Sequence, residues 1–339
     1  MSRKLITIST IMTLMSTSVM ADVPNVAADI APIHSLVSKV MDGVGEPKLI
    51  IQSGASPHGY RLRPSEAKAL QDANLIFWMG EELTPWLEGA IDTLASNASV
   101  TALLDQKGIV LHDFRQGALF EAHDHDDHDD HDDHDDHKDH DDHDDHDGHD
   151  DHKDHNDHDG HDDHDDHGHG AHDPHAWLSP ENAKLWLNII ASKLSVADPE
   201  NAASYFTNAA AGQAEIEDMV AEVSATLKPV QGGKFVVFHD AYQYFENDFD
   251  FYASGAISLS DASDPSPARI ARIQKRIRDE GIQCVLAEPQ FKQGLVATVM
   301  EGSEATASVI DPLGADIKPG PMLYTQLIKN MAKKIKDCL

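Results

Sequence analysis

The chain has 339 residues, a formal net charge of −33 and a hydrophobic content of 40%. This acidity, with no basic stripe, argues against nucleic acid and anionic membrane surfaces as partners. No run of about 18 apolar residues follows the N-terminus, so no membrane-spanning helix is expected in the mature chain.

Residues 1–21 have the features of a secretory signal peptide. Arg3 and Lys4 form a positive start, residues 5–15 a short apolar stretch, and Ala21 ends a small-residue cleavage site. The apolar stretch is too short to anchor the protein, and no cysteine follows the cleavage site to carry a lipid. We therefore predict an exported, soluble product; an uncleaved N-terminal helix is the alternative.

Residues 22–198 are predicted to form an N-terminal α/β lobe, because strand-like and helix-like segments alternate with short connections. Two of the predicted helices start with a capping residue followed by proline, which suits the first helical position. The predicted strands are 48–52, 74–79 and 108–111, and the predicted helices begin at Pro64, Pro85 and Pro180.

An insert of residues 123–172 interrupts this lobe. Its 50 residues include 18 of the 23 histidines, 24 acidic residues and two lysines, which gives the insert a charge of −22. The Asp-Asp-His unit recurs with a period of three, so an extended conformer with about three residues per turn would align the imidazoles on one side. Nothing in the insert can form a core, and we predict that it is disordered without metal.

A long helix is predicted over residues 199–228, followed by a C-terminal α/β lobe over residues 229–339. Apolar side chains recur in the helix close to a period of 3.6, and a rod of about 45 Å would be long enough to back both lobes. Alternating strands and helices imply a parallel sheet in each lobe. The predicted strands of the second lobe are 234–238, 251–257, 283–287 and 307–310, and its helices are 267–280 and 322–336.

Cys284 and Cys338 are the only cysteines in the chain. An oxidising compartment favours a disulfide between them, closing a loop that the chain-entropy model values at roughly 4 kcal/mol. A reactive thiol or a thiolate metal ligand is the alternative.

Several potential metal ligands are predicted at the edges of the two sheets. His239, Glu288 and Asp311 each follow a predicted strand, and ligands of parallel sheets gather beyond the carboxyl ends of the strands. In the first lobe His58 follows a strand, and His175 lies just before a helix. If the lobes face each other, the cleft between them is lined with imidazole.

Four segments in order resemble the metal-site blocks of the periplasmic zinc-binding proteins of ABC transporters, the ZnuA type. They are GASPHGYRLRPS (54–65), DPHAWL (173–178), VFHDAY (237–242) and DPLG (311–314), and APIHSL (31–36) extends the likeness. The resemblance implies two α/β lobes joined by a long rigid helix, with one tight metal site in the interlobe cleft. It also implies a periplasmic protein that captures Zn²⁺ and delivers it to an inner-membrane ABC permease.

Carried over residue by residue, the resemblance implies that His58, His175 and His239 bind the metal. Three neutral imidazoles suit a tetrahedral Zn²⁺ site, whereas manganese prefers more carboxylate. Relatives that carry manganese tend to have Glu at the position of His239. Asp173 and Asp240 are candidates for orienting the imidazoles, because each lies next to or near a ligand in sequence.

The fourth ligand is left open by the sequence. Asp311 matches the carboxylate that completes the site in several relatives, and its alternative role is to cap the turn that follows it. Some zinc-specific members have Glu directly before the first His, where this chain has Pro57. The remaining candidates are a water molecule, Glu81 and Glu82, although the two glutamates also suit an exposed first helical turn.

The insert is predicted to collect zinc weakly at many sites, and a solvated charge run that only aids solubility is the alternative. The predicted secondary weak sites are His123, His125, His128, His131, His134, His137, His140, His143, His146, His149, His152, His155, His158, His161, His164, His167, His169 and His172.

Other functions compete with zinc delivery. A zinc hydrolase is disfavoured because the chain has neither a His-Glu-x-x-His helix nor a Gly-x-Ser-x-Gly elbow. A periplasmic zinc buffer or chaperone without a permease, and a manganese carrier on the same fold, remain as alternatives. We expect a monomer without enzymatic activity.

Overall fold

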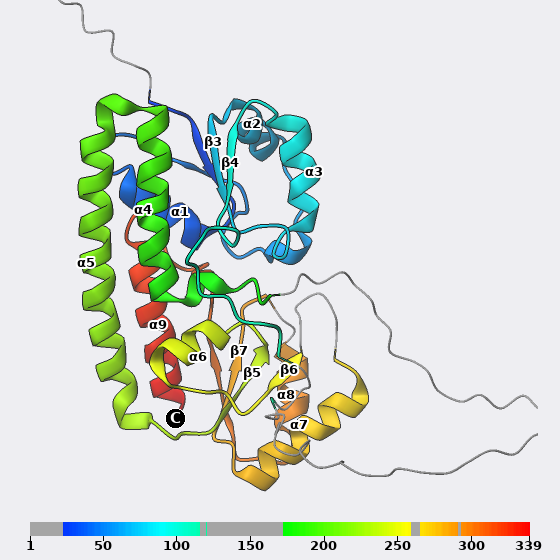
Figure 1. Cartoon of the computed structure of the whole chain (residues 1–339). Helices are drawn as coiled ribbons and strands as arrows, with labels where there is room; N and C mark the ends of the chain where they lie inside the picture. Colours follow the sequence, from blue (N-terminus) through cyan, green and yellow to red (C-terminus); the bar gives the residue numbers. More distant parts are fainter. Residues whose placement is uncertain (1–22, 116–119, 121–171, 259–264, 291–292) are drawn as a thin grey trace, which may run out of the picture.

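The structure is a computed structural model that describes residues 23–115, 120, 172–258, 265–290 and 293–339. The predicted signal peptide and every histidine of the insert except His172 lie outside these residues. Two α/β lobes lie one above the other, and long helices run beside both of them (Figure 1). Among the described helices, none combines the length and apolar character needed to cross a membrane.

The N-terminal lobe is built on a four-stranded parallel sheet with the strand order β2-β1-β3-β4. The prediction of a strand at 108–111 is wrong. The edge strand of the sheet is β4 (Ser99–Ala102) instead. The backbone of Val110 is bonded to the side chain of Asn182, which accepts from its N–H at 2.9 Å and donates to its carbonyl at 3.0 Å. The strands are β1 (Val26–Ala28), β2 (Lys48–Leu49), β3 (Leu75–Trp78) and β4 (Ser99–Ala102), and the helices α1 (Ala31–Val40), α2 (Pro64–Asp72) and α3 (Pro85–Leu94).

A buried carboxylate joins the ends of two neighbouring strands in this sheet. Asp29 follows β1, and its two oxygens accept from the backbone N–H groups of Ile30 and Met79, each at 2.7 Å. Burial raises the pKa of Asp29 to about 7, while the backbone donors act in the opposite direction. The carboxylate thus fixes the turn after β1 against the end of β3.

Two antiparallel helices, α4 (Pro180–Ala197) and α5 (Ala202–Leu227), form the spine of the molecule. The predicted long helix 199–228 is confirmed: α5 is continuous, and 3₁₀ turns at Pro199–Asn201 and Lys228–Val230 extend its two ends. The helices approach closely at Gly212, where a Cβ atom would lie 3.0 Å from a methyl group of Leu187.

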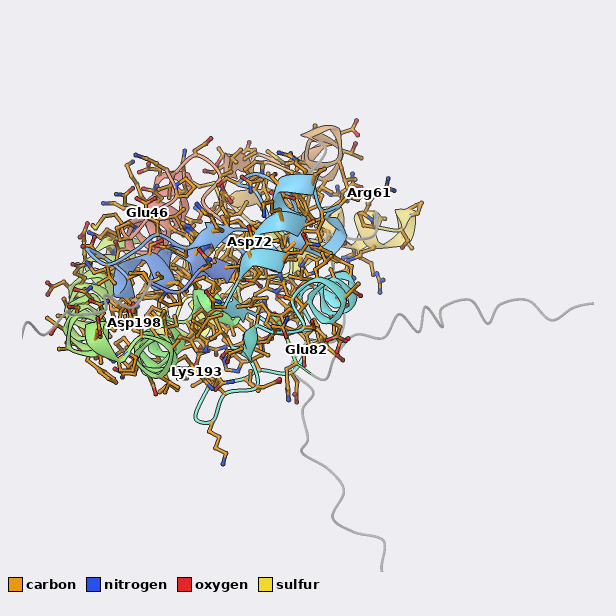
Figure 2. The ribbon with its side chains drawn as sticks, turned by 90° about the horizontal axis from the view of Figure 1, so that it is seen from above. Glu46, Arg61, Asp72, Glu82, Lys193 and Asp198 are labelled. Atoms are coloured by element: carbon orange, nitrogen blue, oxygen red, sulfur yellow. A yellow bond between two sulfur atoms is a disulfide. The ribbon has the colours of Figure 1, made fainter. Side chains whose placement is uncertain are left out.

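Asp198 ties the connection between the two long helices. Its Oδ2 accepts from the side-chain amide of Asn201 and from the hydroxyl of Tyr205, both at 2.7 Å. Seen from above, Asp198 lies at the ends of these helices, whereas Arg61 and Glu82 lie on the other side of the lobe (Figure 2).

The C-terminal lobe repeats the architecture with the strand order β6-β5-β7-β8, all parallel. The short helices α6 and α8 were not predicted. His239 is the last residue of β5 rather than the residue after it. The strands are β5 (Phe235–His239), β6 (Ala256–Ser258), β7 (Cys284–Ala287) and β8 (Thr306–Val309), and the helices α6 (Gln243–Phe249), α7 (Pro267–Glu280), α8 (Gln293–Met300) and α9 (Leu323–Cys338).

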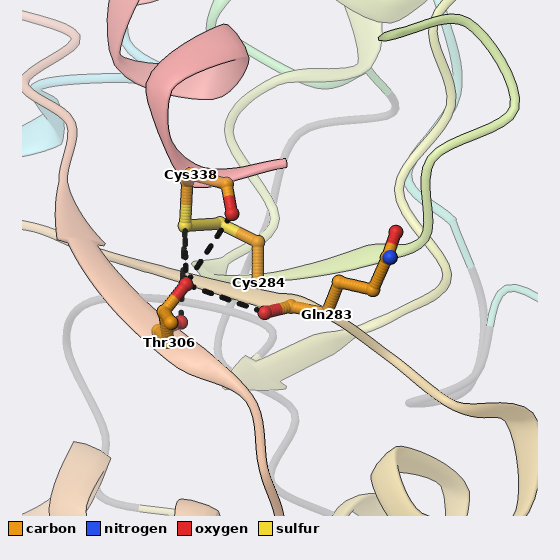
Figure 3. The surroundings of a disulfide bond; sticks show 4 residues. All are labelled: Gln283, Cys284, Thr306 and Cys338. Carbon is orange, nitrogen blue, oxygen red and sulfur yellow. Dashed lines mark hydrogen bonds between the residues drawn. A yellow bond between two sulfur atoms is a disulfide. The ribbon is translucent and has the colours of Figure 1, made fainter.

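Cys284 and Cys338 form a disulfide, as predicted (Figure 3). Their Cα atoms are 5.6 Å apart, and the bond joins the first residue of the central strand β7 to the last residue of α9. The hydroxyl of Thr306 in β8 lies 3.3 Å from the carbonyl oxygen of Cys338. The end of the last helix is therefore fixed to two strands of the sheet.

Removing this disulfide should lower the free energy of unfolding by about 4 kcal/mol, because the unfolded chain regains the entropy of an open loop. We expect the Cys284→Ala/Cys338→Ala variant and the reduced wild-type protein to unfold at similarly lowered urea concentrations, measured by circular dichroism. Equal midpoints for the oxidised wild type and the double variant would contradict a stabilising role.

Candidate metal centre

Three histidines that are distant in sequence meet between the lobes. One nitrogen from each of His58, His175 and His239 lies within 4.8 Å of the other two. Within the described ranges no other group of histidine, cysteine or acidic side chains meets this criterion. His175 and His239 are only 5% and 3% exposed, and His58 is half-buried. The structure thus brings together the three imidazoles that the sequence singled out.

His58 is presented by a short 3₁₀ turn, Pro57–Gly59. The hydroxyl of Ser56 accepts from the backbone N–H of His58 at 3.3 Å and caps this turn. From helix α3, the indole N–H of Trp86 donates to the carbonyl of Pro57 at 2.7 Å. The backbone of this ligand is therefore anchored from the N-terminal lobe.

His175 is oriented by Asp173, which lies two residues before it. One carboxylate oxygen, Oδ1, lies 2.6 Å from Nδ1 of the ring and accepts from the backbone N–H of the same histidine at 3.0 Å. Burial raises the pKa of Asp173 to about 6, and the hydrogen bond from the backbone of His175 acts against this rise. The expected role of Asp173 is thus matched by its position.

His239 is oriented by Glu288, which follows the neighbouring strand β7. Its Oε1 lies 2.5 Å from Nδ1 of His239, and its Oε2 accepts from the side-chain amide of Gln290 at 2.7 Å. Glu288 is 3% exposed. Glu288, which the sequence offered as a potential metal ligand, therefore orients His239 and is not part of the group of three histidines.

The two carboxylates determine which nitrogens face the cleft. Each accepts a hydrogen bond from an Nδ1–H group, so the neutral rings of His175 and His239 carry the lone pair that can bind a metal on Nε2. These two Nε2 atoms are 3.4 Å apart. Ligands placed tetrahedrally at about 2.05 Å from a zinc ion are separated by about 3.3 Å. The spacing of the pair fits one tetrahedral zinc ion.

The walls around the three rings are largely apolar. Pro57, Trp177, Pro312 and Leu313 line the same cavity as the three histidines. The indole N–H of Trp177 donates to the carbonyl of Pro312 at 2.8 Å, which joins the two sides of the cavity. Such surroundings exclude water and strengthen the attraction between a cation and its ligands.

The acidic candidates for the fourth ligand lie outside this cluster. Asp311 accepts from the backbone N–H groups of Leu313 at 2.9 Å and Gly314 at 3.0 Å, so the geometry favours its alternative role as the cap of this turn. Glu81 and Glu82 lie in the turn before α3, and neither lines the cavity. The described cluster therefore consists of three imidazoles and contains none of the predicted acidic ligands.

Asp240 does not orient an imidazole, contrary to the prediction. Its carboxylate forms an ion pair with Arg115, whose guanidinium also reaches Glu246 in α6 at 2.6 Å. Arg115 and both carboxylates are largely buried. Because charged groups are costly to bury without partners, this ion-pair triad fixes the segment that contains Arg115 to the C-terminal lobe.

The segment that leads into the insert and the last residue of the insert are held together on this same lobe. Asp113 and His172 form an antiparallel bridge, and Nδ1 of the histidine lies 2.9 Å from the carboxylate of Asp113. The hydroxyl of Tyr244 in α6 donates to the carbonyl of Asp173 at 2.7 Å and accepts from the backbone N–H of His112 at 3.1 Å. The segments on both sides of the insert therefore contact α6 of the C-terminal lobe.

Comparison with known proteins places these features in a family. Residues 26–338 match the ZnuA family, described as the periplasmic component A of a zinc-uptake complex. The chain is 51% identical over 314 residues to the high-affinity zinc uptake system protein ZnuA of Brucella abortus, covering 93% of this chain and 91% of that protein.

Solved structures share the fold. The crystal structure of ZnuA superposes with a TM-score of 0.69 at 21% identity, covering 94% of this chain and 99% of that one. The solute-binding protein FpvC from Pseudomonas aeruginosa, in complex with Mn²⁺, gives a TM-score of 0.70 at 17% identity, covering 93% and 98%. At these identities the likeness establishes the fold alone and does not decide between zinc and manganese.

Removing the carboxylate that orients His239 should weaken zinc binding. We expect Glu288→Ala to lower zinc affinity by about 10- to 100-fold, because the ring loses the acceptor that fixes its tautomer and orientation. Glu288→Gln keeps a carbonyl acceptor and should lose less. The measurement is a titration against a competing chelator, with the exposed Glu301→Ala as the matched control. Equal affinities for Glu288→Ala and Glu301→Ala would refute this role.

Proposed function

Because the chain belongs to the ZnuA family of periplasmic zinc-uptake components, we propose that it captures Zn²⁺ in the periplasm and delivers the ion to an inner-membrane ABC permease. The observation that carries the proposal is the spacing of 3.4 Å between Nε2 of His175 and Nε2 of His239, with His58 beside them. In this proposal residues 1–21 direct export and the mature protein acts as a monomer.

The donor set supports zinc over manganese as the cargo. All three residues of the cluster are histidines, and the neighbouring carboxylates of Asp173 and Glu288 are engaged with imidazoles. Manganese is a harder ion that favours oxygen ligands, whereas neutral imidazole suits zinc. The manganese carrier is therefore the weaker alternative.

Capture and release involve no covalent chemistry in this proposal. Two imidazoles are held by carboxylates before the ion arrives, so little rearrangement of these rings opposes binding. Release requires the three nitrogens to separate or to take up protons. The chain acts as a carrier, and its activity is measured as affinity and rate of transfer rather than as turnover.

The insert is proposed to collect zinc at many weak sites and to raise the local supply of the ion. The anchoring of its base on α6, within a few residues of His175, supports delivery toward the cleft. A periplasmic zinc buffer without a permease would also use such a segment. Restored zinc uptake on re-expression in cells that lack the protein, and its loss when the permease is also absent, would decide for delivery.

Each cleft histidine should be needed for tight binding, whereas single insert histidines should not. We expect His58→Ala, His175→Ala and His239→Ala each to lower the affinity by about 100-fold or more, since one of three metal bonds is lost. His140→Ala is the matched control in the insert and should leave the tight site unchanged. Calorimetric titration in the presence of a competing chelator measures the difference.

Deleting the insert should leave the tight site intact, because none of the three cleft ligands belongs to it. A variant that joins Phe120 to His172 through a short glycine linker keeps Arg115 and the bridge from Asp113 to His172, and it should therefore bind one zinc ion with the affinity of the full chain. A loss of tight binding in this variant, with an unchanged circular dichroism spectrum, would show that the two roles are not separable.

Zinc affinity should fall as the pH is lowered from 7 to 5. A free imidazole takes up a proton near pH 6.5, and protonated imidazole cannot bind the ion. The raised pKa of Asp173, about 6, means that the acceptor of the Nδ1 proton of His175 is protonated over the same range. Both changes weaken binding, by about tenfold or more in total. Competition titrations at pH 7, 6 and 5 test this; a constant affinity would contradict it.

A further inference from the structure

Although the chain is acidic overall, helix α7 is strongly basic, a feature that was not predicted from the sequence. Helix α7 carries five of the 26 lysines and arginines within 14 residues. Its two acidic residues lie in the last turn, where Asp279 pairs with Lys275 and Glu280 pairs with Arg276. Three exposed cations, Arg272, Lys275 and Arg278, define what we call the basic face of α7.

Among the described residues, only part of the charge of this face is balanced, because Lys275 alone has an acidic partner. In the part of the chain that the structure describes, no ion pair joins Arg272 or Arg278 to an acidic side chain. Helix α8, which packs against α7, has no charged residue in its sequence. Arg269, half-buried at the start of α7, donates to the carbonyls of Ile257 and Ala256 at 2.7 and 3.1 Å.

At the N-terminal end of α7, the positive charges of Arg269 and Arg272 repel each other. The pKa of Arg269 is lowered to about 10 by burial first and by the positive charge of Arg272 second. An anion placed on the face would relieve this repulsion. The face therefore offers a surface that favours an acidic partner.

The second basic helix of the chain differs in this respect. Helix α9 contains several lysines, but it packs against α5, which is rich in acidic residues. Lys329 of α9 pairs with Glu222 of α5 at 2.7 Å. Its charge is thus partly compensated by a neighbouring helix, whereas α8, the helix that packs against α7, supplies no acidic side chain.

The base of the insert lies close to the basic face. Asp240, which binds Arg115 ahead of the insert, directly follows β5. Strand β5 pairs with β6, whose carbonyls accept from Arg269 at the start of α7. The chain between Phe120 and His172 has 51 residues, so half of it spans about 80 Å when extended. Helix α7 is about 21 Å long. The acidic insert therefore reaches the whole face without strain on its ends.

We propose that the basic face of α7 is a docking surface for the chain's own acidic insert, residues 123–171. The insert carries nearly all of its charge as carboxylate, and its tether keeps it at a high effective concentration near the face. Each exposed ion pair contributes little, so the docking is a sum of several weak contacts that salt disperses. Docking holds the histidines of the insert against the C-terminal lobe and needs no metal.

Carbodiimide cross-linking of the full chain, stripped of metal and at low salt, tests the proposal. The reagent joins lysine amines to nearby carboxylates, and mass spectrometry identifies the pairs. We expect cross-links from Lys275 to aspartates of residues 123–171 at a yield at least about five times that of the exposed Lys193 of α4, because the insert's carboxylates gather at the face. The yield should fall to the level of Lys193 in about 1 M NaCl.

Charge reversal supplies the matched comparison. Arg272→Glu/Arg278→Glu should lower the Lys275 cross-links at least about fivefold, and Arg61→Glu/Lys228→Glu, which changes the net charge equally away from α7, should not. Unchanged melting temperatures show that both variants fold. Equal yields at Lys275 and Lys193, or no effect of reversing α7, would overturn the proposal. Salt-sensitive binding of the full chain to vesicles of anionic lipid, without these cross-links, would assign the face to a membrane and overturn it also.

Discussion

The geometry of the candidate metal centre depends on two hydrogen bonds between buried carboxylates and imidazoles. Asp173 and Glu288 each hold Nδ1 of one histidine, and each thereby turns Nε2 toward the cleft. Without these contacts a buried ring has two tautomers and can rotate about its side chain. With them, the two nitrogens that face each other are defined before any ion is present. The rest of the site, including its apolar walls, is arranged around this pair.

The fold then explains how such distant residues meet. His239 ends β5 and Glu288 follows β7, and these strands are neighbours in one parallel sheet, so the pair is formed within the C-terminal lobe. Asp173 and His175 belong to the segment that returns from the insert and is bonded to α6. His58 alone comes from a loop fixed by the N-terminal lobe. The distance from His58 to the other two histidines therefore depends on how the N-terminal lobe is placed relative to the C-terminal lobe.

Much of this was predictable from the sequence, because the ligand histidines lie where parallel sheets place their ligands and where the family resemblance puts them. The orienting role of Glu288 was not, since it depends on β5 and β7 being adjacent, which strand order alone decides. The prediction that Asp240 orients an imidazole was wrong, because its nearness to His239 in sequence does not reveal that Arg115 lies beside it in the fold. Likewise β4 was missed because two of its four residues are exposed and its sequence lacks a strong apolar pattern.

The antiparallel bridge between Asp113 and His172 places the last residue of the insert beside the segment that leads into it. For a loop whose ends are already adjacent, doubling its length costs only about 0.6 kcal/mol of closure entropy. Adding or removing a few Asp-Asp-His units therefore changes the closure entropy of the loop very little. In the proposed division of roles, the length of the insert can therefore change while the geometry of the three cleft histidines stays the same.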